Sequence, residues 1–127
     1  MASILIVEDS PDNMKLFRTL LTLKGHTVTG LIGGDELFAT LGQMTPDLVL
    51  MDIQMPGKDG FTLLGEVRDS EHRNLRIVAL TANAMAGDME KALDAGFDGY
   101  ISKPIDIRQF PDQVARALEG KNPLGPA

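Results

Sequence analysis

Short runs of branched apolar residues alternate along the chain with longer segments in which apolar residues recur at helical spacing. The first run, residues 3–7, stops abruptly at Glu8 and Asp9, which is typical of a buried strand that ends at a polar edge. Ser10 and Pro11 follow, and these residue types favour the N-cap and the first position of a helix. The pattern therefore predicts a strand that leads directly into a helix.

The same strand–helix unit recurs five times along the chain. We expect strands over residues 3–7, 26–32, 47–51, 75–80 and 99–102. The intervening helices are expected over residues 11–24, 35–44, 61–69, 87–95 and 105–118. Because strands joined by crossover helices form parallel sheets with both faces covered, the sequence predicts an α/β fold with a doubly wound, five-stranded parallel sheet.

Two positions carry finer expectations. Asp35 is a candidate N-cap for the second helix. Pro111 conflicts with a last helix that begins at residue 105, because proline removes a backbone donor and crowds the carbonyl four residues earlier. We therefore expect this helix to start late or to have a distorted first turn, unless Pro111 itself opens the helix. Residues 1–119 are expected to form one domain, and residues 120–127, with two prolines and two glycines, a flexible tail.

Acidic residues follow the first and third predicted strands. Glu8, Asp9 and Asp52 should meet at one edge of the sheet, where neighbouring strands lie ~4.8 Å apart. Carboxylates so close repel one another unless a cation is present, and an all-oxygen cluster suits a hard ion such as Mg²⁺. Solvated turn acids are the usual explanation for a single aspartate after a strand, but three acids at corresponding strand ends favour a metal site.

The fourth and fifth strands end in groups that suit an anion. Thr81 supplies a hydroxyl and Lys103 a mobile ammonium. A carboxylate that attacks phosphorus becomes an acyl phosphate, and its charge needs a metal, a cation and hydrogen-bond donors. Either residue alone would be an ordinary strand-end or surface residue, whereas their placement opposite the acids predicts phosphoryl chemistry.

Composition narrows the partners. The 127 residues include 18 acidic and 12 basic side chains, and the net charge of -6 disfavours direct binding to nucleic acid or anionic lipid. Cysteine is absent, which removes thiolate chemistry and suits a reducing cytoplasm. No apolar run approaches the roughly 20 residues of a membrane span, so membrane insertion is not expected.

Four strings in this sequence resemble the motifs of response-regulator receiver domains. They are Ile6-Val7-Glu8-Asp9, the segment from Met51 to Gly60, Leu80-Thr81-Ala82 and Ser102-Lys103-Pro104. The resemblance spans residues 3–119 and implies a flavodoxin-like fold with strand order 2-1-3-4-5. Residues 13–17 and the lack of an attached output domain resemble the stand-alone, DivK-like regulators of cell division and polarity.

The resemblance also implies roles for individual residues. Asp52 would be the phosphoacceptor, and its phosphoryl oxygens would contact Thr81, Lys103 and the backbone amide of Ala82. Mg²⁺, or Mn²⁺ or Ca²⁺ in its place, would be held by Asp9, Asp52, the backbone carbonyl of Gln54 and, through water, Glu8. The remaining roles are a switch pair of Thr81 and Tyr100, a cis peptide bond before Pro104, and side chains at Gln54 and Asn83 that tune the lifetime of the phosphate.

Protein partners follow from the same resemblance. The phosphoryl donor would be a phosphohistidine of a sensor histidine kinase or a histidine phosphotransfer protein. A downstream protein would bind the face formed by the fourth helix, fifth strand and fifth helix. The chain is thus expected to be a signalling phosphoacceptor with slow self-dephosphorylation rather than an enzyme. We expect a cytoplasmic monomer or weak dimer, with recruitment to the cell pole or membrane by a partner kinase.

Three alternatives are weaker. A phosphatase or phosphomutase with an aspartate nucleophile should carry a second acid two residues after it, and Gln54 stands there. A dinucleotide site requires a glycine-rich turn after the first strand, where this chain has Glu8 and Asp9. A receiver-like scaffold that no longer accepts phosphate is disfavoured because every site position is filled.

Overall fold

The computed structural model describes residues 2–53, 60–81 and 86–120, except for the side chains of residues 86–89. Five parallel strands form one sheet in the order β2-β1-β3-β4-β5. They are β1 (Ser3–Val7), β2 (Thr27–Leu31), β3 (Leu48–Asp52), β4 (Ile77–Thr81) and β5 (Gly99–Ser102). The predicted doubly wound, flavodoxin-like fold and its strand order are confirmed.

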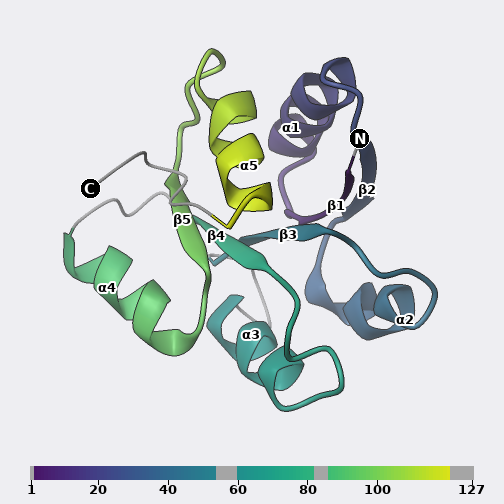
Figure 1. Ribbon diagram of the computed structural model, residues 1–127, viewed down its shortest axis with the longest axis vertical. Coiled ribbons are helices and arrows are strands. Elements are labelled where there is room, and N and C mark those ends of the chain that lie inside the picture. The colour runs from purple at the N-terminus through teal and green to yellow at the C-terminus, as the bar shows by residue number, and fades with distance from the viewer. Residues whose placement is uncertain (1, 54–59, 82–85, 121–127) are drawn as a thin grey trace.

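Helices cover both faces of this sheet (Figure 1). On one face lie α1 (Pro11–Leu23) and α5 (Phe110–Leu118). On the other lie α2 (Leu37–Leu41), α3 (Gly60–Arg68) and α4 (Ala86–Ala95), and α2 is preceded by the 3₁₀ turn η1 (Gly34–Glu36). None of the described helices is both long and apolar enough to cross a membrane.

Alternate residues of each central strand pack into opposite layers of the core. In β1, Ile4 and Ile6 pack on the side of α1 and α5, whereas Leu5 and Val7 pack on the side of α2, α3 and α4. All four are fully buried, and full burial of such a side chain stabilises the fold by about 1.5–3 kcal/mol. The strand ends that carry the candidate site therefore rest on a rigid frame.

The beginning of α1 matches the prediction, and the beginning of α2 does not. Ser10 is the N-cap of α1, and its side chain accepts a hydrogen bond from the Asn13 amide at 3.3 Å. Asp35 is not a cap, because it lies within η1, and α2 ends at Leu41 rather than near residue 44. Gly34 approaches α3 so closely that a Cβ there would lie 2.6 Å from the Leu63 side chain. This tertiary contact accompanies a tight 3₁₀ turn at the place where local sequence predicts a helix start.

The last helix starts late, as Pro111 predicted. It begins at Phe110 with Pro111 in its first turn, where a missing backbone donor costs little because the first amides of a helix have no intrahelical partner. The Phe110 ring stacks on Phe17 of α1, with ring centroids 5.2 Å apart, and anchors the two helices to each other. The expected tail, apart from Gly120, lies outside the described residues.

Candidate functional site

Three carboxylates meet at the carboxyl edge of the sheet. Glu8 and Asp9 directly follow β1, and Asp52 is the last residue of the neighbouring β3. One carboxylate oxygen of each lies within 4.8 Å of the others. Glu8 is fully buried and Asp52 is 2% exposed, whereas Asp9 is partly exposed. The predicted acidic cluster is therefore present, and its two most buried members lie at the carboxyl ends of adjacent strands.

Lys103 brings a positive charge into the cluster. Its Nζ lies 2.9 Å from Oδ2 of Asp52 and 2.6 Å from Oε1 of Glu8. The Lys103 backbone amide donates a 2.7 Å hydrogen bond to the carbonyl of Thr81, which continues the pairing of β4 with β5 up to the site. The peptide bond before Pro104 is cis, as predicted.

Glu8 is held from two sides. Its Oε2 accepts a 3.1 Å hydrogen bond from the Ser10 amide, and its Oε1 forms the ion pair with Lys103 but accepts no well-directed hydrogen bond from the described residues. Burial raises the pKa of Glu8, and nearby Asp52 adds to this rise, while Lys103 and the Ser10 amide oppose it. Burial lowers the pKa of Lys103, but its close contacts with the carboxylates of Glu8 and Asp52 outweigh burial, so the pKa of Lys103 is raised.

The raised pKa of Glu8 predicts a pH dependence of stability in the absence of divalent cations. From the ordinary pKa of 4.5 up to the raised pKa, the folded state binds more protons at Glu8 than the unfolded state, so stability falls as pH rises through this window. The free energy of unfolding of the wild type should therefore decline with pH relative to Glu8→Gln. Urea unfolding at a series of pH values with a chelator present measures this difference.

A matched variant separates the site from general charge effects. Glu36 is exposed on η1, and Glu36→Gln should follow the wild-type curve. Parallel pH curves for the wild type and Glu8→Gln would contradict the assignment of the dependence to Glu8.

The cluster fits a divalent cation. Three carboxylates against the single ammonium of Lys103 leave two negative charges unbalanced, and all the donors are hard oxygens of the kind that Mg²⁺ prefers. The Oε1 atom of Glu8, buried and poorly hydrogen-bonded, also has acceptor capacity to spare. Asp9, more exposed than its two neighbours, lies where an ion entering from solvent would meet it.

The other predicted residues have different outcomes. Thr81 ends β4 and is 3% exposed, one position beyond the residue that pairs with Asp52. Tyr100 is also 3% exposed, and it packs in the core layer of α3 and α4. Gln54, Ala82 and Asn83 lie outside the described residues.

Two site features were not foreseen from the sequence. The direct Glu8–Lys103 pair joins residues 95 positions apart, and no local pattern signals it. The Ser10 amide that holds Glu8 belongs to a residue that local reasoning identifies only as a helix cap. The neighbouring Glu8-Asp9-Ser10 turn is the one signal in the sequence that points to such a bond.

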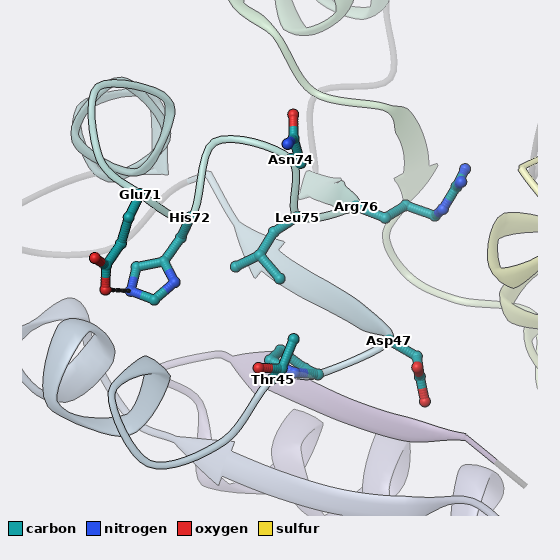
Figure 2. A pocket seen from close by; sticks show the side chains of 8 residues that line it. Thr45, Asp47, Glu71, His72, Asn74, Leu75 and Arg76 are labelled. Carbon is teal, nitrogen blue, oxygen red and sulfur yellow. Dashed lines mark ion pairs between the residues drawn. The ribbon is translucent and has the colours of Figure 1, made fainter.

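A separate hollow of about 480 Å³ lies at the opposite end of the sheet, between the loops that lead into β3 and β4 (Figure 2). Glu71 and His72 point toward each other on one side of it, with an ion pair of 3.6 Å, and Arg76 lies on another side. None of the predicted site residues that the structure describes lines this hollow. The described candidate site residues therefore lie at the carboxyl edge of the sheet, as expected for a parallel α/β sheet.

Fold and site together define the class of protein. The chain belongs to the response regulator receiver domain family, which matches residues 4–115. It is a phosphoacceptor of two-component signalling.

Particular relatives refine this class. The chain is similar to the polar-differentiation response regulator DivK of Brucella ovis, with 39% identity over 117 residues, which cover 91% of this chain and 95% of the Brucella protein. It is also similar to the receiver domain of a sensor histidine kinase from Pseudomonas aeruginosa PAO1, solved with a magnesium ion in its active site cleft (TM-score 0.82, 34% identity, 93% of this chain and 98% of that one). A histidine kinase receiver domain from Syntrophus aciditrophicus has a TM-score of 0.83 and 30% identity, covering 94% of this chain and 92% of that one.

Proposed function

We propose that Asp52 accepts the phosphoryl group from a phosphohistidine donor. The observation that carries this assignment is the position of its carboxylate, which is nearly buried at a strand end, 2.9 Å from the Lys103 ammonium and beside two further carboxylates. Asp9, Asp52, the backbone carbonyl of Gln54 and, through water, Glu8 would hold Mg²⁺, for which Mn²⁺ or Ca²⁺ could substitute. The bound ion would supply positive charge that offsets the charge of the phosphoryl oxygens.

The chain's own residues orient and stabilise the transfer. An oxygen of Asp52 attacks phosphorus in line with the donor, so that a bond from Asp52 to phosphorus forms while the bond from phosphorus to the histidine nitrogen breaks. Lys103 then exchanges its contact with Asp52 for a phosphoryl oxygen, and the Thr81 hydroxyl and Ala82 amide donate to the other oxygens. Slow attack of water on the acyl phosphate clears the signal, and Gln54 and Asn83 are proposed to set its rate.

The wider role follows from the relatives. The name of the Brucella relative refers to polar differentiation, and we propose a comparable signalling role in which a sensor histidine kinase or phosphotransfer protein is the donor. The face of α4, β5 and α5 would bind the downstream protein, with Thr81 and Tyr100 as the switch pair. Residues 1–119 would act as the receiver domain and 120–127 as a flexible tail, in a cytoplasmic protein that a partner kinase recruits to the cell pole or membrane.

The decisive experiment replaces the phosphoacceptor. With Mg²⁺ and a small acyl phosphate, the wild type should gain the mass of one phosphoryl group in intact-mass spectrometry, and Asp52→Asn should gain none, since an amide is not a comparable nucleophile. Asp69→Asn alters an exposed aspartate just beyond α3 and should gain the group at the wild-type rate. Phosphorylation of Asp52→Asn at the wild-type level would refute the assignment.

A further inference from the structure

Ser10 connects the acidic cluster to the first turn of α1. Its backbone amide donates a 3.1 Å hydrogen bond to Oε2 of Glu8, and its side-chain oxygen accepts a 3.3 Å hydrogen bond from the Asn13 amide. Its carbonyl accepts a 2.9 Å hydrogen bond from the Met14 amide. All three polar groups of this one residue are therefore engaged, one by the carboxylate cluster and two by the helix.

The backbone of Ser10 is constrained from the side of the helix. Its φ of -84° and ψ of 117° are extended, which is the conformation of an N-cap residue. Pro11 occupies the next position, and a proline disfavours helical backbone in the residue before it. The bond from the Asn13 amide to the Ser10 hydroxyl joins the same residue to the first turn. The direction in which the Ser10 amide points is therefore set by the way in which this residue is joined to α1.

The Glu8 carboxylate depends on this amide for its orientation. Glu8 is fully buried, and its other oxygen, Oε1, lies 2.6 Å from Nζ of Lys103 but accepts no well-directed hydrogen bond from the described residues. The Lys103 ammonium is shared, since it also lies 2.9 Å from Oδ2 of Asp52. Within the part of the chain that the structure describes, the Ser10 amide therefore gives Glu8 its well-directed hydrogen bond.

A fixed Glu8 matters for the affinity of the cluster for a cation. The oxygens of Glu8, Asp9 and Asp52 lie within 4.8 Å of one another and repel, so a carboxylate that is free to turn would move away from its neighbours. Hydrogen bonds from groups around a metal site hold the ligands in place, and their loss typically weakens metal binding about ten- to a hundredfold. The bond from the Ser10 amide to Glu8 is a contact of this kind.

We propose that the Ser10 side chain is a positioning group for the divalent metal site. By capping α1 it holds the backbone amide that fixes the Glu8 carboxylate, and it thereby raises the affinity of the cluster for Mg²⁺. The inference rests on the proposed function, in which Glu8 contributes to the metal site. It adds to that function a residue whose hydroxyl acts only through Glu8, and it makes the first turn of α1 part of what sets the affinity for the metal.

The test measures Mg²⁺ binding by isothermal titration calorimetry with magnesium chloride alone. Ser10→Ala removes the hydroxyl but keeps the amide, and should bind Mg²⁺ about two- to tenfold more weakly than the wild type, a factor that corresponds to the loss of an N-cap. Ser10→Thr keeps the hydroxyl and should retain the wild-type affinity. With a small acyl phosphate, Ser10→Ala should need more Mg²⁺ for its half-maximal phosphorylation rate but should reach the wild-type rate at saturating Mg²⁺.

Thr19→Gly separates this role from the general stability of the helix. Thr19 is exposed within α1, and glycine there weakens the helix without altering its cap. The thermal unfolding midpoint with a chelator should fall in both Thr19→Gly and Ser10→Ala, but Thr19→Gly should bind Mg²⁺ as tightly as the wild type. Ser10→Ala should also cause little further loss of affinity in a Glu8→Gln background, because Ser10 and Glu8 act through one contact.

Three results would overturn the positioning role of Ser10. They are wild-type affinity in Ser10→Ala, an equal loss of affinity in Thr19→Gly, and an undiminished effect of Ser10→Ala in the Glu8→Gln background. A wild type that bound no Mg²⁺ would overturn the metal site of the proposed function together with this inference. A wild type that bound Mg²⁺ but gained no phosphoryl group would overturn the role of Asp52 and leave that of Ser10 intact.

Discussion

Lys103→Met should lower the free energy of unfolding by about 3 kcal/mol near neutral pH without divalent cations, because it leaves two buried carboxylates without their counter-charge. Glu8 is fully buried and the Asp52 side chain is 3% exposed, so water cannot readily replace the ammonium that lies 2.6 and 2.9 Å from them. The same variant should lose at least about tenfold in phosphorylation rate, since no cation would balance the incoming oxygens. Urea unfolding and intact-mass kinetics measure the two effects.

Two comparisons show whether the loss arises from the buried charges. Addition of Mg²⁺ should restore part of the stability of Lys103→Met, because a bound cation compensates the same carboxylates. Asp52→Asn in the Lys103→Met background should also restore stability, because it removes one of the uncompensated charges. If Lys103→Met were as stable as the wild type in the presence of a chelator, the ion-pair account of this site would be wrong.

Gly60→Ala is the second change with a large expected effect. The new methyl group would lie less than 3.0 Å from backbone atoms of both Asp52 and Ile53, and these atoms cannot rotate away as a flexible side chain can. The first turn of α3 must therefore move away from the phosphoacceptor. We expect a loss of about 1–3 kcal/mol in the free energy of unfolding. The phosphorylation rate should fall roughly ten- to a hundredfold, because misplacement by about 1 Å is costly for an in-line transfer.

The same helix offers a matched control. Gly65 lies in the interior of α3, is exposed, and a Cβ there would meet nothing within 4 Å. Gly65→Ala should stabilise the protein by about 0.5–1 kcal/mol, because alanine favours the helix more than glycine does, and should leave phosphorylation unchanged. If both glycine variants behaved alike, the close approach of Gly60 to the strand end would not matter for the reaction.

The local sequence predicted secondary structure correctly where the pattern of apolar and capping residues depends on one helix or strand alone. The run at residues 3–7 had to be a buried strand because both of its faces are apolar, and Ser10 had to cap a helix because its side chain lies within reach of the next amides. Pro111 predicted the late start of α5 for an equally local reason. The prediction that Asp35 caps the second helix was wrong, because the preference of aspartate for N-cap positions is a local property, whereas the turn that contains Asp35 packs against Leu63 of α3.

By itself, the sequence predicted strands that end at or directly before Glu8, Asp9, Asp52, Thr81 and Lys103, and parallel topology then required these positions to share one edge. Only the tertiary structure decided that Lys103 pairs with Glu8 as well as Asp52, and that Gly60 abuts the phosphoacceptor. The periodicity of apolar residues predicts which face of a helix or strand is buried, because the residues that must leave water recur on that face. Contacts between side chains of different elements depend on how those elements pack in three dimensions, which no local pattern encodes.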